Sequence, residues 1–196
     1  GIKTYTNGAG NIDIDSSAYI YALQEGILTN AENGTTTISL DTVAANIVAG
    51  YDGIRATSYG TKGGDILIDL VNTDAAIDID AGRTGIYAVT SGDGDVTVTA
   101  AAGSYIRGNG GIAGAFDGIT AVASNGSYVN NISVTADDVF GGDDGISTFT
   151  FNGDVKVDTS AAGSVVTGAG DDGISAWAGG FGGAGDIDID AVNVYG

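Results

Sequence analysis

The sequence predicts an all-β protein, a right-handed parallel β-helix (solenoid) of about seven coils, each with about 28 residues and three strands. Three observations predict this fold. The dipeptide Gly-Ile recurs at seven positions spaced 25 to 33 residues apart, each of these is followed by a stretch in which β-branched and polar residues alternate, and the intervening segments are rich in Gly, Asn and Asp. No segment shows the 3.6-residue hydrophobic period that helical repeats require.

The first strand of each coil is predicted to begin at Gly-Ile. Successive dipeptides are separated by 25, 27, 32, 33, 27 and 28 residues, and alanine or threonine stands two residues after each isoleucine. The dipeptides are Gly1-Ile2, Gly26-Ile27, Gly53-Ile54, Gly85-Ile86, Gly118-Ile119, Gly145-Ile146 and Gly173-Ile174. An acidic residue often precedes them, as Asp117 and Asp144 do. We expect such a carboxylate to bond its own backbone N–H groups in a turn where the glycine takes a positive φ.

The second strand is predicted about ten residues later, at an apolar-x-apolar motif. The motif reads Ile12/Ile14, Ile38/Leu40, Ile66/Ile68, Val96/Val98, Ile132/Val134, Val155/Val157 and Ile187/Ile189. Its middle residue is mostly polar and should face water, because alternate side chains of a strand point to opposite faces. A third, looser strand is predicted around Ile20, Ile47, Ile77 or Ile79, Ile106, Val139, Val166 and Val194.

Residues 1–196 are expected to form a single β-helix array. Gly1-Ile2 falls inside a first strand and Val194-Tyr195-Gly196 inside a third strand, so neither terminus shows a cap. Uncapped coils leave strand edges unpaired. We therefore expect an excised interior segment of a longer rod, or a unit that associates end to end with copies of itself.

The chain is strongly acidic, with six Lys and Arg residues against 25 Asp and Glu residues and a formal net charge of −19. Nucleic acids are held mainly by Lys and Arg, so they are not expected as partners. No run approaches the roughly 20 apolar residues of a membrane span, and no membrane insertion of this segment is expected. The absence of cysteine excludes disulfides and is compatible with export.

Several phrases resemble the passenger domains of autotransporters and related β-helical adhesin-like proteins of the bacterial surface. They include the runs Gly64-Asp65-Ile66-Leu67-Ile68-Asp69, Gly170-Asp171-Asp172-Gly173-Ile174-Ser175-Ala176 and Gly185-Asp186-Ile187-Asp188-Ile189-Asp190. The resemblance is one of repeat style over the whole chain. It implies an exported rod at the cell surface, followed by a membrane β-barrel that this sequence does not contain. No functional residue carries over from it.

Catalysis is not expected, and neither are catalytic, cofactor-binding or metal-binding residues. The chain has no histidine, and Arg55, Arg83 and Arg107 fall in different segments of the repeat. Neighbouring acids occur at Asp137-Asp138, Asp143-Asp144 and Asp171-Asp172, but these pairs stand in predicted turns, where solvated carboxylates are usual. An enzyme working on polysaccharides needs a convergent acid–base set.

A column of acids is predicted three residues after the start of each second strand. It consists of Asp15, Asp41, Asp69, Thr99, Thr135, Asp158 and Asp190. Stacked coils would bring Asp15, Asp41 and Asp69 to within about 5 Å of one another. The interpretation is a solvated acidic edge, with weak Ca²⁺ binding as the alternative, because carboxylates and water are ligands that calcium prefers.

Two ligand-binding functions remain as alternatives. Ice binding needs a flat array of Thr-x-Thr ranks, and the sequence offers Thr97/Thr99 with Ser133/Thr135 beside it. A glycan or protein partner could use exposed aromatic residues, which are expected at Tyr5, Phe149 and Trp177 on the first strands and at Tyr19, Tyr21, Tyr105, Phe140 and Tyr195 on the third. Trp177 and Phe181 are the predicted contact point.

Taken together, the sequence favours a non-catalytic structural or adhesive module of an extracellular fibre on the bacterial cell surface, without a required cofactor. Its expected partners are further coils of the same kind and a host-surface, matrix or glycan ligand. The alternative is a solenoid that binds ice or a glycan.

Overall fold

The computed structural model describes residues 1–41, 46–71, 76–108, 116–180 and 185–196, which form three parallel seven-stranded sheets and contain no helix. The Gly-Ile strands make sheet A, which consists of β1 (Ile2–Thr6), β4 (Ile27–Ala31), β7 (Ile54–Ser58), β10 (Ile86–Thr90), β13 (Ile119–Ala123), β16 (Ile146–Thr150) and β19 (Ile174–Ala178). The prediction that all Gly-Ile strands share one sheet is confirmed.

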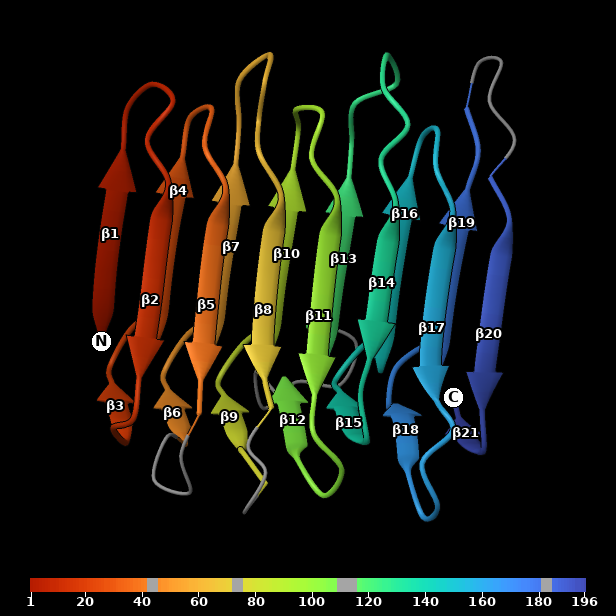
Figure 1. The fold of residues 1–196 in the computed structure, drawn as a ribbon. Helices are drawn as coiled ribbons and strands as arrows, with labels where there is room; N and C mark the ends of the chain where they lie inside the picture. Colours follow the sequence, from red (N-terminus) through yellow and green to blue (C-terminus); the bar gives the residue numbers. More distant parts are fainter. Residues whose placement is uncertain (42–45, 72–75, 109–115, 181–184) are drawn as a thin grey trace.

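The second and third strands form the other two sheets (Figure 1). Sheet B consists of β2 (Ile12–Ser16), β5 (Thr36–Leu40), β8 (Ile66–Leu70), β11 (Val96–Ala100), β14 (Ile132–Thr135), β17 (Val155–Thr159) and β20 (Ile187–Ala191). Sheet C consists of β3 (Ile20–Ala22), β6 (Ile47–Ala49), β9 (Ile79–Ala81), β12 (Tyr105–Gly108), β15 (Asp138–Gly141), β18 (Val165–Gly168) and β21 (Asn193–Tyr195).

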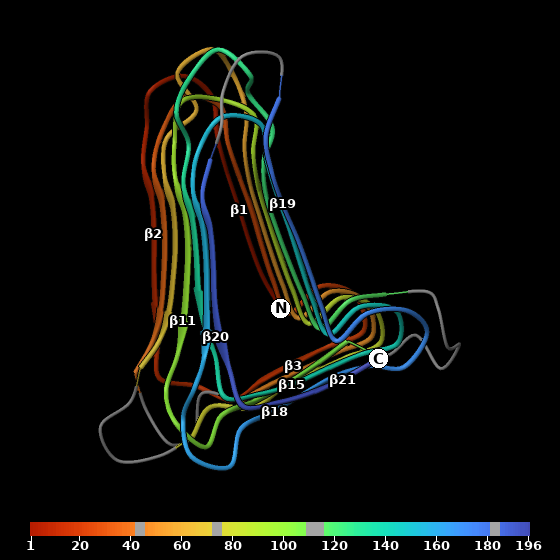
Figure 2. The ribbon, with the colours of Figure 1, turned by 90° about the vertical axis from the view of Figure 1, so that its right-hand side faces the viewer.

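The coil is a right-handed β-helix with a three-sided cross-section. Figure 2 looks along the rod from its C-terminal end: the chain ascends sheet A, descends sheet B and crosses sheet C, circulating anticlockwise as it advances toward the viewer. The chain makes about six turns, slightly fewer than the predicted seven coils, because the seven strands of each sheet are separated by six steps. Hydrogen bonds between successive coils run along the rod axis.

The core is a set of columns of apolar side chains that point inward from all three sheets. Ile27, Ile54 and Ile86 pair in register on sheet A, and all three are fully buried. Sheet C contributes a similar column through Ile47, Ile79 and Ile106. Ile79 therefore holds the strand position that the sequence left open between two residues, and Ile77 is buried in the preceding corner.

The register of the second coil differs from the prediction. Strand β5 pairs Thr36 with Ile12 and Ile66, and Ile38 with Ile14 and Ile68, so its motif is displaced by two residues. A strand of sheet B has three inward positions, and an apolar-x-apolar motif can occupy the first two or the last two. In β5 it occupies the last two, and the hydroxyl-bearing Thr36 is fully buried at the first.

The glycines of the Gly-Ile dipeptides are needed for space and not for a positive φ. The glycines with positive φ are Gly8, Gly60, Gly103, Gly163 and Gly179, and none belongs to a dipeptide. A Cβ on Gly85 would lie 2.5 Å from the carbonyl oxygen of Gly118 in the next coil. The expected positive-φ turn is therefore wrong, because here the backbones of adjacent coils approach too closely for any side chain.

Candidate functional site

Ladders of Asn and Asp side chains hold the corners of successive coils together. In the corner before sheet B, the side-chain Oδ1 of a residue in one coil accepts a hydrogen bond from a backbone N–H in the next coil. The acceptor and donor residues are Asn11 and Thr35 (3.0 Å), Asp65 and Asp95 (2.9 Å), Asp95 and Asn131 (2.6 Å), Asn131 and Asp154 (3.0 Å), and Asp154 and Asp186 (2.9 Å). Sequence reasoning missed this ladder, although its members immediately precede the second strand in every coil except the second, where Thr35 stands. These amide and carboxylate oxygens therefore link neighbouring coils.

The acids before Gly-Ile form a second ladder and do not bond their own backbone as expected. Asp144 Oδ1 accepts from the backbone N–H of Asp172 in the next coil at 3.0 Å, and Asp117 Oδ1 accepts from that of Asp144 at 3.3 Å. The hydroxyl of Thr120 donates to Asp117 Oδ2 at 2.7 Å. Burial nevertheless raises the pKa of Asp117 above its usual value, although these two hydrogen bonds oppose the shift.

The raised pKa of Asp117 predicts a pH-dependent effect of the Asp117→Asn variant. Folding raises the pKa of this carboxyl, so its contribution to stability is full below the unfolded pKa of 3.8 and is lost as pH rises through the folded pKa. Asparagine is neutral at every pH and keeps an acceptor oxygen for the Asp144 N–H. Urea midpoints should therefore be higher for the variant at pH 7 and equal to wild type at pH 3. A gain of equal size at both pH values would contradict the prediction.

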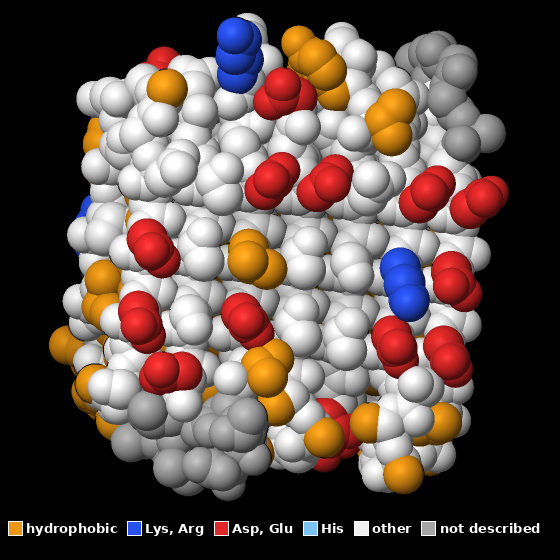
Figure 3. All heavy atoms as spheres, in the orientation of Figure 1, with side chains coloured by type: hydrophobic (Ala, Val, Ile, Leu, Met, Phe, Trp, Pro, Cys, Tyr) orange, Lys and Arg blue, Asp and Glu red, His pale blue; other side chains and the backbone are white. Residues whose placement is uncertain are grey.

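One member of the predicted column on sheet B is wrong, because the displaced register of β5 puts Ser39, and not Asp41, between Asp15 and Asp69. The remaining members from Asp69 to Asp190 align as predicted, and Asp158 pairs with Asp190. Asp41 lies beyond the end of β5. The outward face shown in Figure 3 thus carries acidic side chains interspersed with uncharged ones. Within the described ranges, no three Asp or Glu side chains are grouped so that they could hold a metal ion.

Hydroxyl groups form incomplete ranks on the same face of sheet B. The register aligns Thr97/Thr99 with Ser133/Thr135, as expected, and adds Thr37/Ser39 in the second coil. Leu67 and Asp69 interrupt the array between these coils. The face is therefore not a continuous lattice of hydroxyls.

The neighbouring acids at Asp137 and Asp138 also bond to adjacent coils. Asp137 accepts hydrogen bonds from the backbone N–H of Gly103 and the hydroxyl of Ser164. Asp138 Oδ1 accepts from the backbone N–H of Val165 at 2.8 Å. These carboxylates thus connect coils on both sides of their own.

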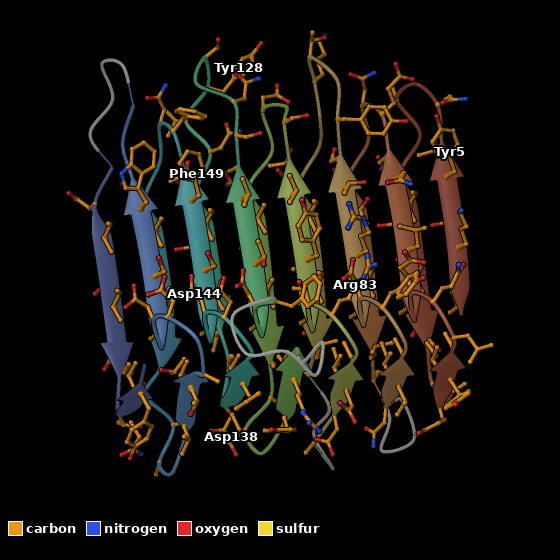
Figure 4. All side chains as sticks on the ribbon, turned by 180° about the vertical axis from the view of Figure 1, so that it is seen from behind. Tyr5, Arg83, Tyr128, Asp138, Asp144 and Phe149 are labelled. Atoms are coloured by element: carbon orange, nitrogen blue, oxygen red, sulfur yellow. The ribbon has the colours of Figure 1, made fainter. Side chains whose placement is uncertain are left out.

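The arginines occupy separate places, and each contacts a different partner. Arg55 lies 3.0 Å from Asp52 and 4.4 Å from the ring centre of Tyr87. Arg83 lies over the rings of Tyr51 (4.2 Å) and Phe116 (5.7 Å), at the corner labelled in Figure 4. Arg107 lies 3.6 Å from Asp80 on sheet C.

Aromatic side chains cluster on the outward face of sheet A near the C-terminal end. Phe149 (Figure 4) stacks on Trp177, with ring centres 4.5 Å apart and planes at 8°, and Phe151 meets Phe149 edge-on at 5.0 Å. Trp177 is 46% exposed. The other half of the predicted contact point, Phe181, lies outside the described residues.

A second aromatic contact lies at the opposite end of sheet A. The hydroxyls of Tyr5 and Tyr59 are 2.9 Å apart, and this hydrogen bond raises the pKa of Tyr59 to about 12. The contact joins the first and third coils at the outer surface.

A ligand-sized depression lies on the outward face of sheet C and spans the first four coils. It is a groove of about 280 Å³ with tyrosines toward both ends and polar side chains between them. Its lining residues are Tyr19, Asn46, Ile47, Val48, Asp78, Ile79, Asp80, Tyr105 and Arg107. The sequence predicted that Tyr19 and Tyr105 are exposed, and the structure confirms this with exposed fractions of 56% and 39%.

The polar groups of the groove are fixed by the coil-to-coil ladder. Asn46 Oδ1 accepts from the backbone N–H of Asp78 at 2.9 Å, and Asp78 Oδ1 accepts from that of Tyr105 at 3.2 Å. Among the described residues, the Asn46 amide N–H₂ and Asp78 Oδ2 have no hydrogen-bond partner, so they can serve a ligand. Burial, helped by the carboxylate of Asp80 and opposed by Arg107, raises the pKa of Tyr105, so its hydroxyl is a donor at neutral pH.

Comparisons with known proteins identify no relative of this chain: no family model, curated protein or solved structure matches it. The described residues contain no helix long and apolar enough to cross a membrane.

Proposed function

We propose that this protein is a non-catalytic structural and adhesive module of an extracellular fibre on the bacterial cell surface. The observation that carries the proposal is the regular stack of coils, in which the seven strands of each sheet pair in parallel and in register along one axis. In the 196-residue chain, the inward residues Ile187, Ile189 and Val194 of the last coil are 46%, 45% and 43% exposed. Their partners one coil earlier, Val155, Val157 and Val166, are at most 1% exposed.

In the isolated 196-residue chain, a coil of a second copy fits this surface. Strands β19, β20 and β21 each pair on one side, with β16, β17 and β18, and their other edges have no partner among the described strands. A coil added there would bury three apolar columns and continue three hydrogen-bond ladders at once. At about 25 cal/mol per Å² of apolar surface, this burial favours association.

The adhesive part of the proposal is supported by the side faces of the rod. The outward residues of sheets A and C include exposed aromatic side chains, such as Trp177 and Tyr19, on a strongly acidic background. Aromatic rings supply contact area at low cost in conformational entropy, and the net charge of −19 disfavours nucleic acid and anionic lipid as partners. Of the two ligand alternatives, the groove on sheet C favours a glycan, whereas the interrupted hydroxyl ranks of sheet B do not suit ice.

Sedimentation velocity tests the rod-forming part. The chain should associate end to end, with a sedimentation coefficient that rises with concentration. Ile189→Lys should abolish this association, because it puts a charge on the surface that the next coil covers. Leu67→Lys, at a 37% exposed site on the side face of sheet B, should leave it unchanged. A wild-type chain that stays monomeric at all concentrations, or one that Ile189→Lys does not affect, would contradict the proposal.

A further inference from the structure

We infer that the groove on sheet C binds a neutral glycan, whose chain lies parallel to the rod axis across the first four coils. This inference extends the adhesive part of the proposed function and rests on it. It is argued from the spacing of the two tyrosines, the polar groups between them and the charge around them.

The groove exists because short side chains stand between two tyrosines in one column. Tyr19, Asn46, Asp78 and Tyr105 each precede an inward isoleucine of sheet C, so they occupy equivalent positions in coils one to four. The tyrosines are three coil steps apart, roughly 14 Å at about 4.8 Å per step. Asparagine and aspartate fill less of the space between them, and the hollow is therefore elongated along the axis.

The walls and floor suit sugar rings. The exposed tyrosine rings offer flat apolar faces, on which the C–H groups of a pyranose ring can pack. Val48 adds an apolar side chain to the floor, whereas Ile47 and Ile79 point into the core and line the groove with backbone. A site of this kind, apolar with a few fixed polar groups, is typical of ligand pockets.

The polar groups match hydroxyls, which both donate and accept hydrogen bonds. Asp78 and Asp80 offer acceptors, while the amide of Asn46, the guanidinium of Arg107 and the Tyr105 hydroxyl offer donors. Arg107 lies 3.6 Å from Asp80, so neither side chain closes the groove. This mixture satisfies a polyhydroxylated ligand without requiring that the ligand carry a charge.

The surrounding charge disfavours acidic sugars, and the backbone disfavours a peptide. Two carboxylates face one guanidinium in the groove, in a protein with a net charge of −19. A peptide usually docks by adding a strand to an open sheet edge. Here the strands of the second and third coils, β6 and β9, are already paired on both sides. Side chains alone therefore present the recognition groups.

The test measures binding of the 196-residue chain to immobilised neutral oligosaccharides. The probes are α- and β-linked oligomers of glucose, mannose, galactose and N-acetylglucosamine, with polygalacturonate as the acidic counterpart. At least one neutral probe should bind, and Tyr19→Ala and Tyr105→Ala should each weaken its binding about tenfold through loss of a stacking face. The control is Tyr128→Ala, which removes a 42% exposed tyrosine from the A-to-B corner labelled in Figure 4 and should leave binding unchanged.

Three results would overturn the inference: no binding to any neutral probe, equal binding by wild type and both groove variants, or tighter binding to polygalacturonate. If no neutral probe binds but the chain still associates end to end in sedimentation, the inference about the groove is wrong and the rod-forming part of the proposed function stands. Glycan binding that survives loss of both tyrosines would keep the adhesive function and move its site elsewhere on the rod.

Discussion

Replacing Ile68 with alanine is expected to lower the free energy of unfolding by about 3–4 kcal/mol. Ile68 is fully buried in the third coil, and its column places it between Ile38 and Val98. Because the three sheets hold the coil from all sides, the surrounding backbone has little freedom to collapse into the space left by the lost atoms. Urea unfolding followed by circular dichroism measures the change.

The matched control is the adjacent residue of the same strand. Leu67 points outward and is 37% exposed, so Leu67→Ala should change the free energy of unfolding by no more than about 0.5 kcal/mol. Equal losses from the two substitutions would mean that strand β8 does not present the faces described.

Replacing Gly118 with alanine is expected to cost about 3 kcal/mol, although alanine is only one methyl group larger. An added Cβ would lie 2.4 Å from Cγ1 of Val139, 2.7 Å from the carbonyl oxygen of Gly145 and 2.9 Å from that of Phe140. Two of these contacts are backbone atoms of the next coil, which can move only if the coil spacing opens. The midpoint of thermal unfolding should fall accordingly.

Gly126→Ala is the control for this substitution. A Cβ there would meet nothing closer than the Phe151 side chain at 3.9 Å, and Gly126 is not among the positive-φ glycines. Its stability should stay within about 0.5 kcal/mol of wild type. A well-tolerated Gly118→Ala would show that the Gly-Ile corners are less tightly packed than in this structure.

The fold could be predicted from the sequence because every coil of a β-helix has the same physical requirements. Each coil needs a residue without a side chain where backbones approach, then β-branched residues on alternate positions, and the seven copies of Gly-Ile display both. The sheet assignment of every Gly-Ile strand follows from that repetition.

Register could not be predicted from the same pattern. Three inward positions in a sheet B strand accept a two-residue motif in two ways, and the buried Thr36 gives no apolar signal to choose between them. The displaced second coil takes Asp41 out of the predicted column and puts Ser39 between Asp15 and Asp69. The corner ladders escaped sequence reasoning for a related reason: Asn and Asp were interpreted as turn formers, whereas their acceptors serve the next coil.

The exposure of the two tyrosines of the groove could be predicted from the sequence, but the groove itself depends on how the coils stack. Exposure of Tyr19 and Tyr105 follows from alternation along the strand. That they delimit one hollow depends on Asn46 and Asp78 occupying the same column in the two intervening coils. Residues 86 positions apart in the chain (105 − 19) are brought to one face by a register that only the folded coils define.

The axial direction of the hydrogen bonds between coils decides how such a rod responds to a pull. Tension applied to the two ends acts along these hydrogen bonds, so those of a terminal coil break one after another. The bonds of a whole sheet are not sheared at the same time. The rod then unfolds one coil at a time, and each coil of about 28 residues releases roughly 95 Å of extended chain. If the rod is anchored as proposed, it should lengthen in steps under sudden drag and rewind onto the remaining coils when the load falls.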